Sequence, residues 1–209
     1  LVSMESKGLR PETLDSLLTQ GVPVILNLDL LPGFQTCCLP LPRGGNFQHY
    51  VLAVGRDRTR GLWVLQNGRR PDQVVSDAWL ARRRAPTGGW ALIAFPPDRR
   101  VSGLPAALHV EAADRSEELG QVEAALFHAE SAARENPKDF EAWFRIGHLG
   151  RPEEAERAYR ICMALEPDRP SAPNNLAMLL AADPSRKTEA ESLAKAALEL
   201  CLNPRRAHL

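Results

Sequence analysis

The feature that most constrains the fold is a regular series of alanine-rich stretches in the second half of the chain, each ended by a proline turn. The turns contain Pro137, Pro167 and Pro204, which are 30 and 37 residues apart. Each interval has room for two helices of about 12 to 15 residues joined by a tight turn. A repeat of this length predicts stacked helical hairpins, because a single hairpin cannot bury its apolar face alone.

The residues inside the repeat resemble those of the tetratricopeptide family, whose period is about 34 residues. In the middle unit, Trp143 and Gly147 match the first-helix signature, and Ala155, Tyr159 and Pro167 match the second. The preceding unit matches through Ala113, Gly120, Ala125, Ala129, Ala132 and Pro137, and the following unit through Leu176, Ala177, Ala190, Ala194 and Ala197. The interval from Trp143 to Ala155 is about one helical turn shorter than in the family. The middle unit is therefore expected to have a shortened first helix.

Composition separates this half from the rest of the chain. Residues 106–209 contain 22 Ala and 4 Val or Ile, whereas residues 1–105 contain 6 Ala and 11 Val or Ile. The first part carries 13 basic and 8 acidic residues, and the second carries 13 and 18. Because alanine favours helices and β-branched residues favour strands, we expect an α+β chain of two domains. A strand-rich domain would span residues 1–98 and a helical domain residues 106–209, joined by the turn-rich segment Pro96 to Pro105.

The first domain alternates short apolar runs with turns. A helix is predicted from Pro11 to Gln20, and the apolar run Val22 to Leu28 predicts a buried strand. The proline- and glycine-rich stretch from Leu30 to Asn46 predicts a long loop. Further elements are predicted as strands at Tyr50 to Val54, Leu62 to Leu65 and Trp90 to Phe95, and as a short helix at Asp72 to Ala81.

Two of these strands could bring a histidine and an amide together. His49 begins one strand, and the next strand ends at Gln66 and Asn67 after a charged turn. A cysteine peptidase of the papain type needs a His on one strand and an Asn or Asp at the end of its neighbour, which holds the imidazole in the right tautomer. The alternative is a His at a strand edge bonded to a backbone carbonyl.

The order of these motifs resembles the bacteriocin-processing, double-glycine leader peptidases, a group of papain-like enzymes. The motifs are the initial helix, Val22 to Leu28, His49 to Gly55, Leu62 to Gly68, and Gly89 to Pro97. The bacterial subgroup in which this domain precedes tetratricopeptide repeats is similar along nearly the whole chain. The resemblance implies a partial papain-like antiparallel-sheet domain and peptide-bond hydrolysis, with His49 as the base and Asn67 or Gln66 orienting it. It also implies a bacterial envelope or export setting.

The family places its nucleophilic Cys on a helix well upstream of the strand that corresponds to Val22 to Leu28, and no Cys precedes that strand here. Three explanations are open: the N-terminal part is missing, another chain supplies the thiol, or the protein is a pseudoenzyme. Cys37 or Cys38 could substitute for the nucleophile, but both lie in the long loop with no helix N-terminus to lower a thiol pKa. The alternative is that each is a plain loop thiol or a disulfide partner. Cys162 and Cys201 are expected to be small core residues of helices.

Other site chemistries have little support in the sequence. The chain contains 26 Lys and Arg against 26 Asp and Glu, which argues against a dedicated nucleic-acid binder. The five histidines show no metal-ligand spacing, and no phosphate-binding or dinucleotide fingerprint occurs, so we expect no metal and no cofactor. Arginines near residues 56–60 and 82–84 form either a basic face for an acidic partner or a solvated surface.

The helical repeats are expected to bind a peptide or protein, because stacked hairpins form an extended concave surface. We expect Arg145, Asn174 and Asn175 to contact such a partner. The two asparagines could instead cap a helix after Pro173. A non-catalytic adaptor, in which both domains only bind, is therefore the alternative to a peptidase-like protein.

Overall fold

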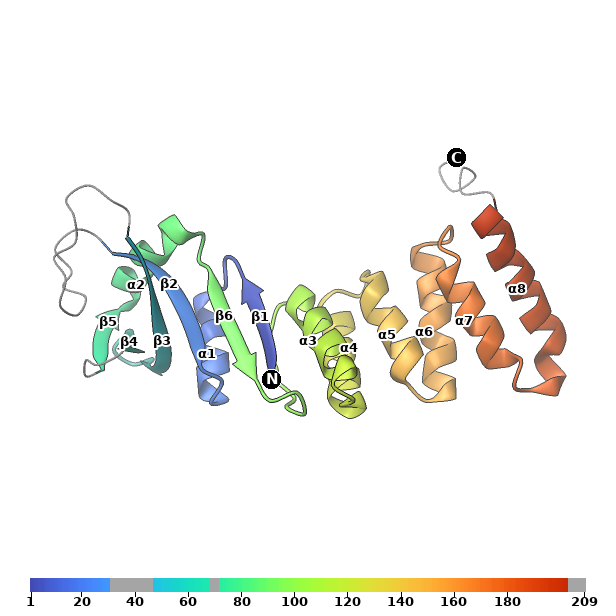
Figure 1. Cartoon of the computed structure of the whole chain (residues 1–209), viewed down its shortest axis with the longest axis horizontal. Coiled ribbons are helices and arrows are strands. Elements are labelled where there is room, and N and C mark those ends of the chain that lie inside the picture. Colours follow the sequence, from blue (N-terminus) through green and yellow to red (C-terminus); the bar gives the residue numbers. More distant parts are fainter. Residues whose placement is uncertain (31–46, 68–71, 203–209) are drawn as a thin grey trace. The chain divides into compact units, whose positions relative to one another are not determined.

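The structure is a computed structural model that describes residues 1–30, 47–67 and 72–202. It divides into two compact units, Leu1–Leu104 and Pro105–Leu209. The first is built on an antiparallel sheet and the second from helices, which confirms a mixed α+β chain (Figure 1). In the part of the chain that is described, no helix is both long enough and apolar enough to cross a membrane.

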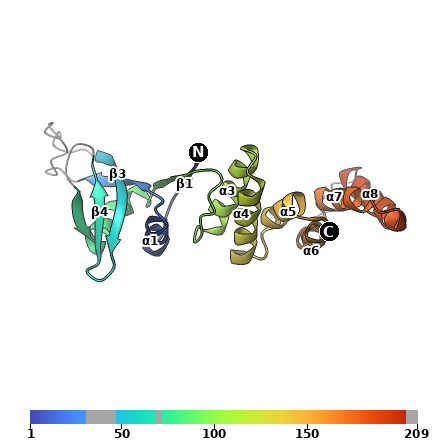
Figure 2. The ribbon, with the colours of Figure 1, turned by 90° about the horizontal axis from the view of Figure 1, so that it is seen from below.

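The sheet of the first unit has the strand order β1-β6-β2-β3-β4-β5, and all its described pairs are antiparallel. Its strands are β1 (Val2–Ser6), β2 (Val24–Leu30), β3 (Phe47–Asp57), β4 (Leu62–Gln66), β5 (Gln73–Ser76) and β6 (Ala91–Phe95). Strands β3 and β4 form the long hairpin visible in Figure 2.

One face of this sheet is buried under two helices, α1 (Pro11–Thr19) and α2 (Asp77–Arg84). Alternate residues of the central strands point into that core, as period-two alternation requires. Val24, Leu26 and Leu28 of β2 are buried there, together with Val51 and Ala53 opposite them on β3. The helices contribute Leu14, Leu17 and Leu80. The opposite face leaves large side chains such as Tyr50 and Val74 exposed.

Residues 72–81 differ from the predicted helix, because Gln73–Ser76 forms the edge strand β5 and the helix begins only at Asp77. Pairing with β4 sets Val74 opposite Val64 and Val75 opposite Trp63, so β-branched residues add to the sheet. The Ser76 side chain accepts a hydrogen bond from the Trp79 N–H and caps the helix. Strand β1 was also not predicted, and β3 extends beyond Tyr50 to Val54 at both ends.

The described part of the second unit, residues 105–202, consists of three helical hairpins that follow one another along the chain, as Figure 1 also shows. They are α3 (Ala106–Glu118) with α4 (Val122–Glu135), α5 (Phe140–Leu149) with α6 (Pro152–Leu165), and α7 (Ser171–Leu180) with α8 (Lys187–Leu202). Helices α5 and α7 have 10 residues each, whereas α3 has 13, so the shortened first helix is not particular to the middle unit. Small side chains fill the contacts, and Ala113, Ala129, Ala132, Ala142 and Ala158 form one buried cluster with Ile146.

Close approach within the second hairpin depends on Gly147. A Cβ atom at this position would lie 2.5 Å from the ring of Tyr159 on α6. The ring takes the space that any side chain at residue 147 would need. The small residue and the aromatic ring are therefore complementary, as the repeat pattern predicts.

Charged links join successive hairpins. Arg145 on α5 lies 2.6 Å from Glu117 on α3, and Arg169 lies 2.7 Å from Glu141 on α5. Arg186, ahead of α8, lies 2.7 Å from Glu156 on α6. Each link thus runs from an arginine to a carboxylate of the preceding hairpin. We call these three contacts the arginine links.

Candidate functional site

The register of β3 and β4 places His49 and Asn67 on the same face of the sheet. His49 lies near the start of β3 opposite Leu28, and Asn67 directly follows the end of β4. Leu52 pairs with Gln66. The next residue of the chain, Asn67, therefore lies opposite Val51, and Val51 is two residues from His49 on β3. Residues two apart on a strand share a face, and their side chains are within reach across the pair.

A β-bulge produces this alignment. The pairing shifts between Ala53 and Gly55, so Val54 is an extra residue on β3. If the register of Asp57 with Leu62 continued unbroken, Asn67 would face Leu52 on the opposite side of the sheet from His49. The bulge therefore turns the Asn67 side chain towards His49.

The two side chains form a short hydrogen bond, with His49 Nε2 and Asn67 Oδ1 2.6 Å apart. An amide oxygen only accepts, so the imidazole Nε2 carries the proton and donates it. In the neutral ring, Nδ1 is then left with its lone pair and is able to take up a proton. Asn67 is 8% exposed and His49 is half-buried, so the amide fixes the imidazole from the interior side.

Gln66 does not take part in this pair. It is exposed, and alternation along β4 directs it to the opposite face of the sheet from Asn67. Of the two candidates for an orienting residue, the structure brings only Asn67 to His49.

The described cysteines both lie in the helical unit. Cys162 is buried in α6, where its thiol contacts the carbonyl oxygen of Phe140 at 3.7 Å and burial raises its pKa to about 12. Cys201 is exposed next to the C-terminal end of α8, so its predicted place in the core is wrong, although it lies on the same side of the helix as the buried Ala190 and Ala197. Cys37 and Cys38 are outside the described residues.

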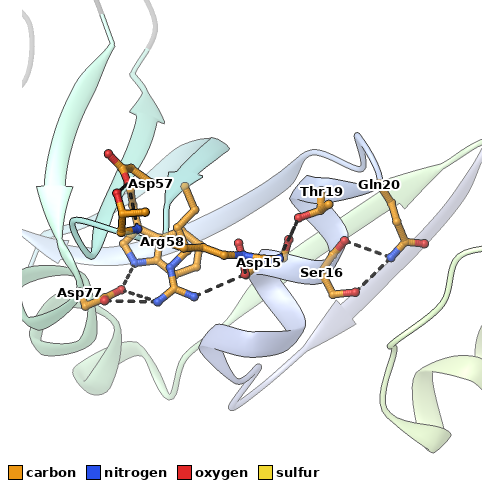
Figure 3. A network of polar contacts seen from close by, with 10 residues as sticks. Asp15, Ser16, Thr19, Gln20, Asp57, Arg58 and Asp77 are labelled. Atoms are coloured by element: carbon orange, nitrogen blue, oxygen red, sulfur yellow. Dashed lines mark hydrogen bonds and ion pairs between the residues drawn. The ribbon is translucent and has the colours of Figure 1, made fainter.

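Several arginines of the first unit are bound within it, by a polar network on the helix-covered face (Figure 3). Arg58 donates to Asp15 on α1 at 2.6 Å, and Arg56 lies between Asp15 and Asp77. Arg84 donates to the backbone carbonyls of Leu9 and Gly89. These three arginines therefore bind groups of their own unit. They match neither of the two expectations, a basic face that is free for an acidic partner or a fully solvated surface.

The three residues expected to bind a partner have different surroundings. Arg145 is held by Asp114 and Glu117 of α3. Asn175 donates to the Tyr159 hydroxyl at 3.4 Å, whereas Asn174 is exposed. Helix α7 begins at Ser171, before Pro173, so neither asparagine caps it.

A cavity of about 720 Å³ lies between the first two hairpins and was not predicted. Its apolar lining includes Trp143, Ile146 and Ile161, and Arg134 and Arg157 line it too. Trp143 is only half-buried, with its indole Nε1 donating to the Pro137 carbonyl at 2.9 Å. The repeat signature predicts that Trp143 packs between helices. It does not predict that part of the ring stays exposed in the cavity.

Two histidines of the first hairpin meet inside it. His109 on α3 and His128 on α4 are both buried, with their Nδ1 atoms 3.0 Å apart. Burial, followed by the neighbouring His128 and Arg134, lowers the pKa of His109 to about 4.

No group of three or more metal-ligating side chains occurs among the described residues.

Comparisons with known proteins give no family for this chain. No protein-family model matches it, and no curated protein matches it. Among solved structures, it is similar to one described as "Crystal structure of MamA protein", with 18% identity and a TM-score of 0.44. That alignment covers 50% of this chain and 59% of the MamA chain.

Proposed function

We propose that the first unit carries the base and the orienting amide of a papain-like cysteine peptidase centre, whose thiol comes from outside the described residues. The observation that carries this proposal is the 2.6 Å hydrogen bond between His49 Nε2 and Asn67 Oδ1. It fixes the tautomer that a thiol-activating base requires and leaves Nδ1 unprotonated.

In the proposed reaction, His49 Nδ1 accepts the thiol proton as the thiolate sulfur attacks the peptide carbonyl carbon. The resulting imidazolium keeps its hydrogen bond to Asn67, and then gives a proton to the departing amine. Water, with His49 again as base, releases the acid product from the acyl-enzyme. Asn67 does not titrate and acts by orienting the ring.

We further propose that the second unit is a set of tetratricopeptide repeats that binds a peptide or protein. The close fit of Gly147 and Tyr159 and the alanine-lined hairpin contacts support this assignment. The 720 Å³ cavity lined by Trp143 and Ile161 offers apolar surface for a partner side chain.

A second candidate is a non-catalytic adaptor, which the positions of the cysteines favour. Neither described thiol lies in the unit that contains His49. Cys162 is buried, with its pKa raised to about 12, so it is a poor nucleophile at neutral pH. In an adaptor, the bond between His49 and Asn67 would only tie β3 to the end of β4.

These alternatives are tested by measuring the rate of peptide hydrolysis in reducing buffer. The sample is the protein in the form that its source cell makes. A papain-like centre predicts that His49→Ala lowers kcat/KM by about 10³-fold or more, and Asn67→Ala by less. Gln66→Ala should change little, because Gln66 lies on the other face. Iodoacetamide trapping and peptide mapping would then identify the thiol.

Cys201 provides an internal reference for this experiment, because it is an exposed thiol far along the sequence from His49. If no peptide is hydrolysed and no thiol reacts faster than Cys201, the peptidase proposal fails and the adaptor remains. Activity that survives His49→Ala would also reject the assigned base.

A further inference from the structure

A cavity of about 370 Å³ lies between α1 and α2 on the helix-covered face of the sheet. Its size falls within the range of small-molecule sites. The lining combines apolar side chains with a few charged ones: Pro11, Glu12, Arg56, Trp63, Asp77, Ala78, Leu80, Ala81 and Arg84. It is separate from the pair formed by His49 and Asn67, neither of which lines it.

Arg84 is an unusually buried cation in this lining, with 7% of its surface exposed. Its Nη2 atom donates to the carbonyl oxygens of Leu9 at 2.8 Å and Gly89 at 3.1 Å. Its Nε atom is buried without a hydrogen-bond partner, and no carboxylate among the described residues pairs with it. Burial lowers its pKa from the usual value. A buried guanidinium without a counter-ion is costly, because carbonyl dipoles compensate only part of its charge.

The other charged side chains of the cavity do not neutralise the positive charge of Arg84. Asp77 is occupied by Arg56, and also accepts from the Trp63 indole at 2.5 Å. Arg56 in turn lies 3.6 Å from Asp15, so its charge is compensated twice. Glu12 is exposed and forms no ion pair with Arg84 in the structure.

The N-terminus of α1 adds a second attraction for an anion. Pro11 and Glu12 open this nine-residue helix at the cavity, and the preceding Arg10 provides no side-chain cap. The N–H groups of an uncapped first turn carry the positive end of the helix dipole. Uncapped helix termini of this kind bind carboxylates and phosphates.

We propose that this cavity binds a small organic carboxylate that carries an apolar group. The carboxylate would pair with Arg84 and the first turn of α1, and the apolar group would pack on Pro11, Ala78 and Ala81, the exposed apolar side chains of the lining. The apolar part of the lining favours such a ligand over an inorganic anion, which would leave those side chains uncovered. A free metabolite and the C-terminal residue of a peptide share this chemistry.

Titration of the whole chain with phenylacetate and with phenylacetamide tests the proposal. The readout is the Trp63 indole N–H signal in NMR spectra, assigned with Trp63→Phe. We expect phenylacetate to shift this signal with a Kd of about 1 mM, and the uncharged amide to bind at least about tenfold more weakly. N-acetyl-Ala-Phe and its C-terminal amide form a second pair of ligands, which separates a peptide C-terminus from a free metabolite.

Variants of the charged residues sharpen this test. Glu12→Gln removes a competing carboxylate and should tighten phenylacetate binding about threefold or more. Arg84→Gln should weaken it at least about tenfold. Arg82→Gln is the matched control, because Arg82 lies exposed on the same helix and does not line the cavity.

Equal binding of acid and amide would overturn the proposal, as would unchanged affinity in a folded Arg84→Gln variant. No shift of the Trp63 signal up to about 20 mM ligand would overturn it as well. If Arg84→Gln does not fold, because Arg84 also holds Leu9 and Gly89, the comparison of acid with amide and the Glu12→Gln variant decide the question.

Discussion

At the scale of single residues, Val54 sets the alignment of the candidate site. As the extra residue of a β-bulge, it shifts the pairing of β3 with β4 by one position. A one-residue shift exchanges the two faces of a strand, so it decides which side chain at the end of β4 meets His49. Asn67 meets it only because the bulge is present.

Deleting Val54 should therefore separate His49 from Asn67. We expect the shortened β3 to pair without a bulge, which turns Asn67 to the opposite face and removes the acceptor from His49 Nε2. Long-range ¹H–¹⁵N NMR of His49 should then show loss of the preference for the Nε2–H tautomer. Val54→Ala keeps the residue count and should retain that preference. Retention in the deletion variant would show that the bulge does not set the alignment.

Gly147→Ala should destabilise the helical unit by about 1 to 3 kcal/mol, because the new methyl group would overlap the Tyr159 ring. Denaturant unfolding followed by circular dichroism measures the change. The control is the same substitution in a Tyr159→Leu background, where the ring is gone and the additional loss should be smaller. Equal losses in both backgrounds would contradict the proposed complementarity.

Sequence reasoning found His49 and Asn67 because a hairpin of two adjacent strands necessarily aligns the start of one with the end of the other. It could not choose between Gln66 and Asn67, because a β-bulge decides which of them lies on the same face as His49. The residue composition of the strands does not indicate where a bulge occurs. It also could not foresee that Arg145 is bound by Asp114 and Glu117, because contacts between hairpins depend on their packing.

At the scale of elements, helices α3 and α4 hold a buried pair of imidazoles. His109 is 1% exposed and His128 is fully buried, with their Nδ1 atoms 3.0 Å apart. Burial disfavours the charged imidazolium of His109, and the neighbouring His128 and Arg134 add smaller repulsions, so its pKa is lowered to about 4.

The stability of the helical unit should consequently fall in mild acid. Above about pH 6.5 both folded and unfolded chains hold His109 neutral, so this residue adds no pH dependence. Between about pH 6.5 and pH 4 the unfolded chain binds a proton that the folded chain does not, which removes about 3 kcal/mol. Urea unfolding at several pH values measures this loss.

His109→Leu should abolish most of that dependence, because it removes the titrating group. His148→Gln is the control, since His148 is exposed and lies 3.3 Å from Glu117 on the surface. A wild-type stability that stays constant from pH 7 to pH 4 would contradict the burial of a neutral imidazole.

The elements themselves were predictable where periodicity was long. The alanine-rich hairpins extend over many helical turns, so the helical period is clear in the sequence even where single residues depart from it. Strand β5 has only four residues, and its β character comes from pairing with β4 and not from its own sequence, which is why it was predicted as helix.

At the scale of the whole molecule, each unit has its own buried core. The first unit encloses Leu26, Ile93 and Trp63 beneath two helices, and the second encloses the alanine cluster around Ile146. A domain with its own core is able to fold alone. Residues 1–104 and 105–209 produced separately should therefore each unfold cooperatively, as measured by calorimetry. A fragment that lacks a cooperative transition would show that the two units depend on each other for folding.

The arginine links have a consequence for how such a chain can be enlarged. Every link points backwards, from an arginine to a carboxylate in the hairpin before it, so no hairpin needs a particular successor for its own bridge. In arrays that depend on nearest neighbours, stability grows roughly by addition. Duplicating a segment that contains α5, α6 and Arg169 would supply both halves of a second bridge between Glu141 and Arg169, so an engineer could lengthen this array one cassette at a time.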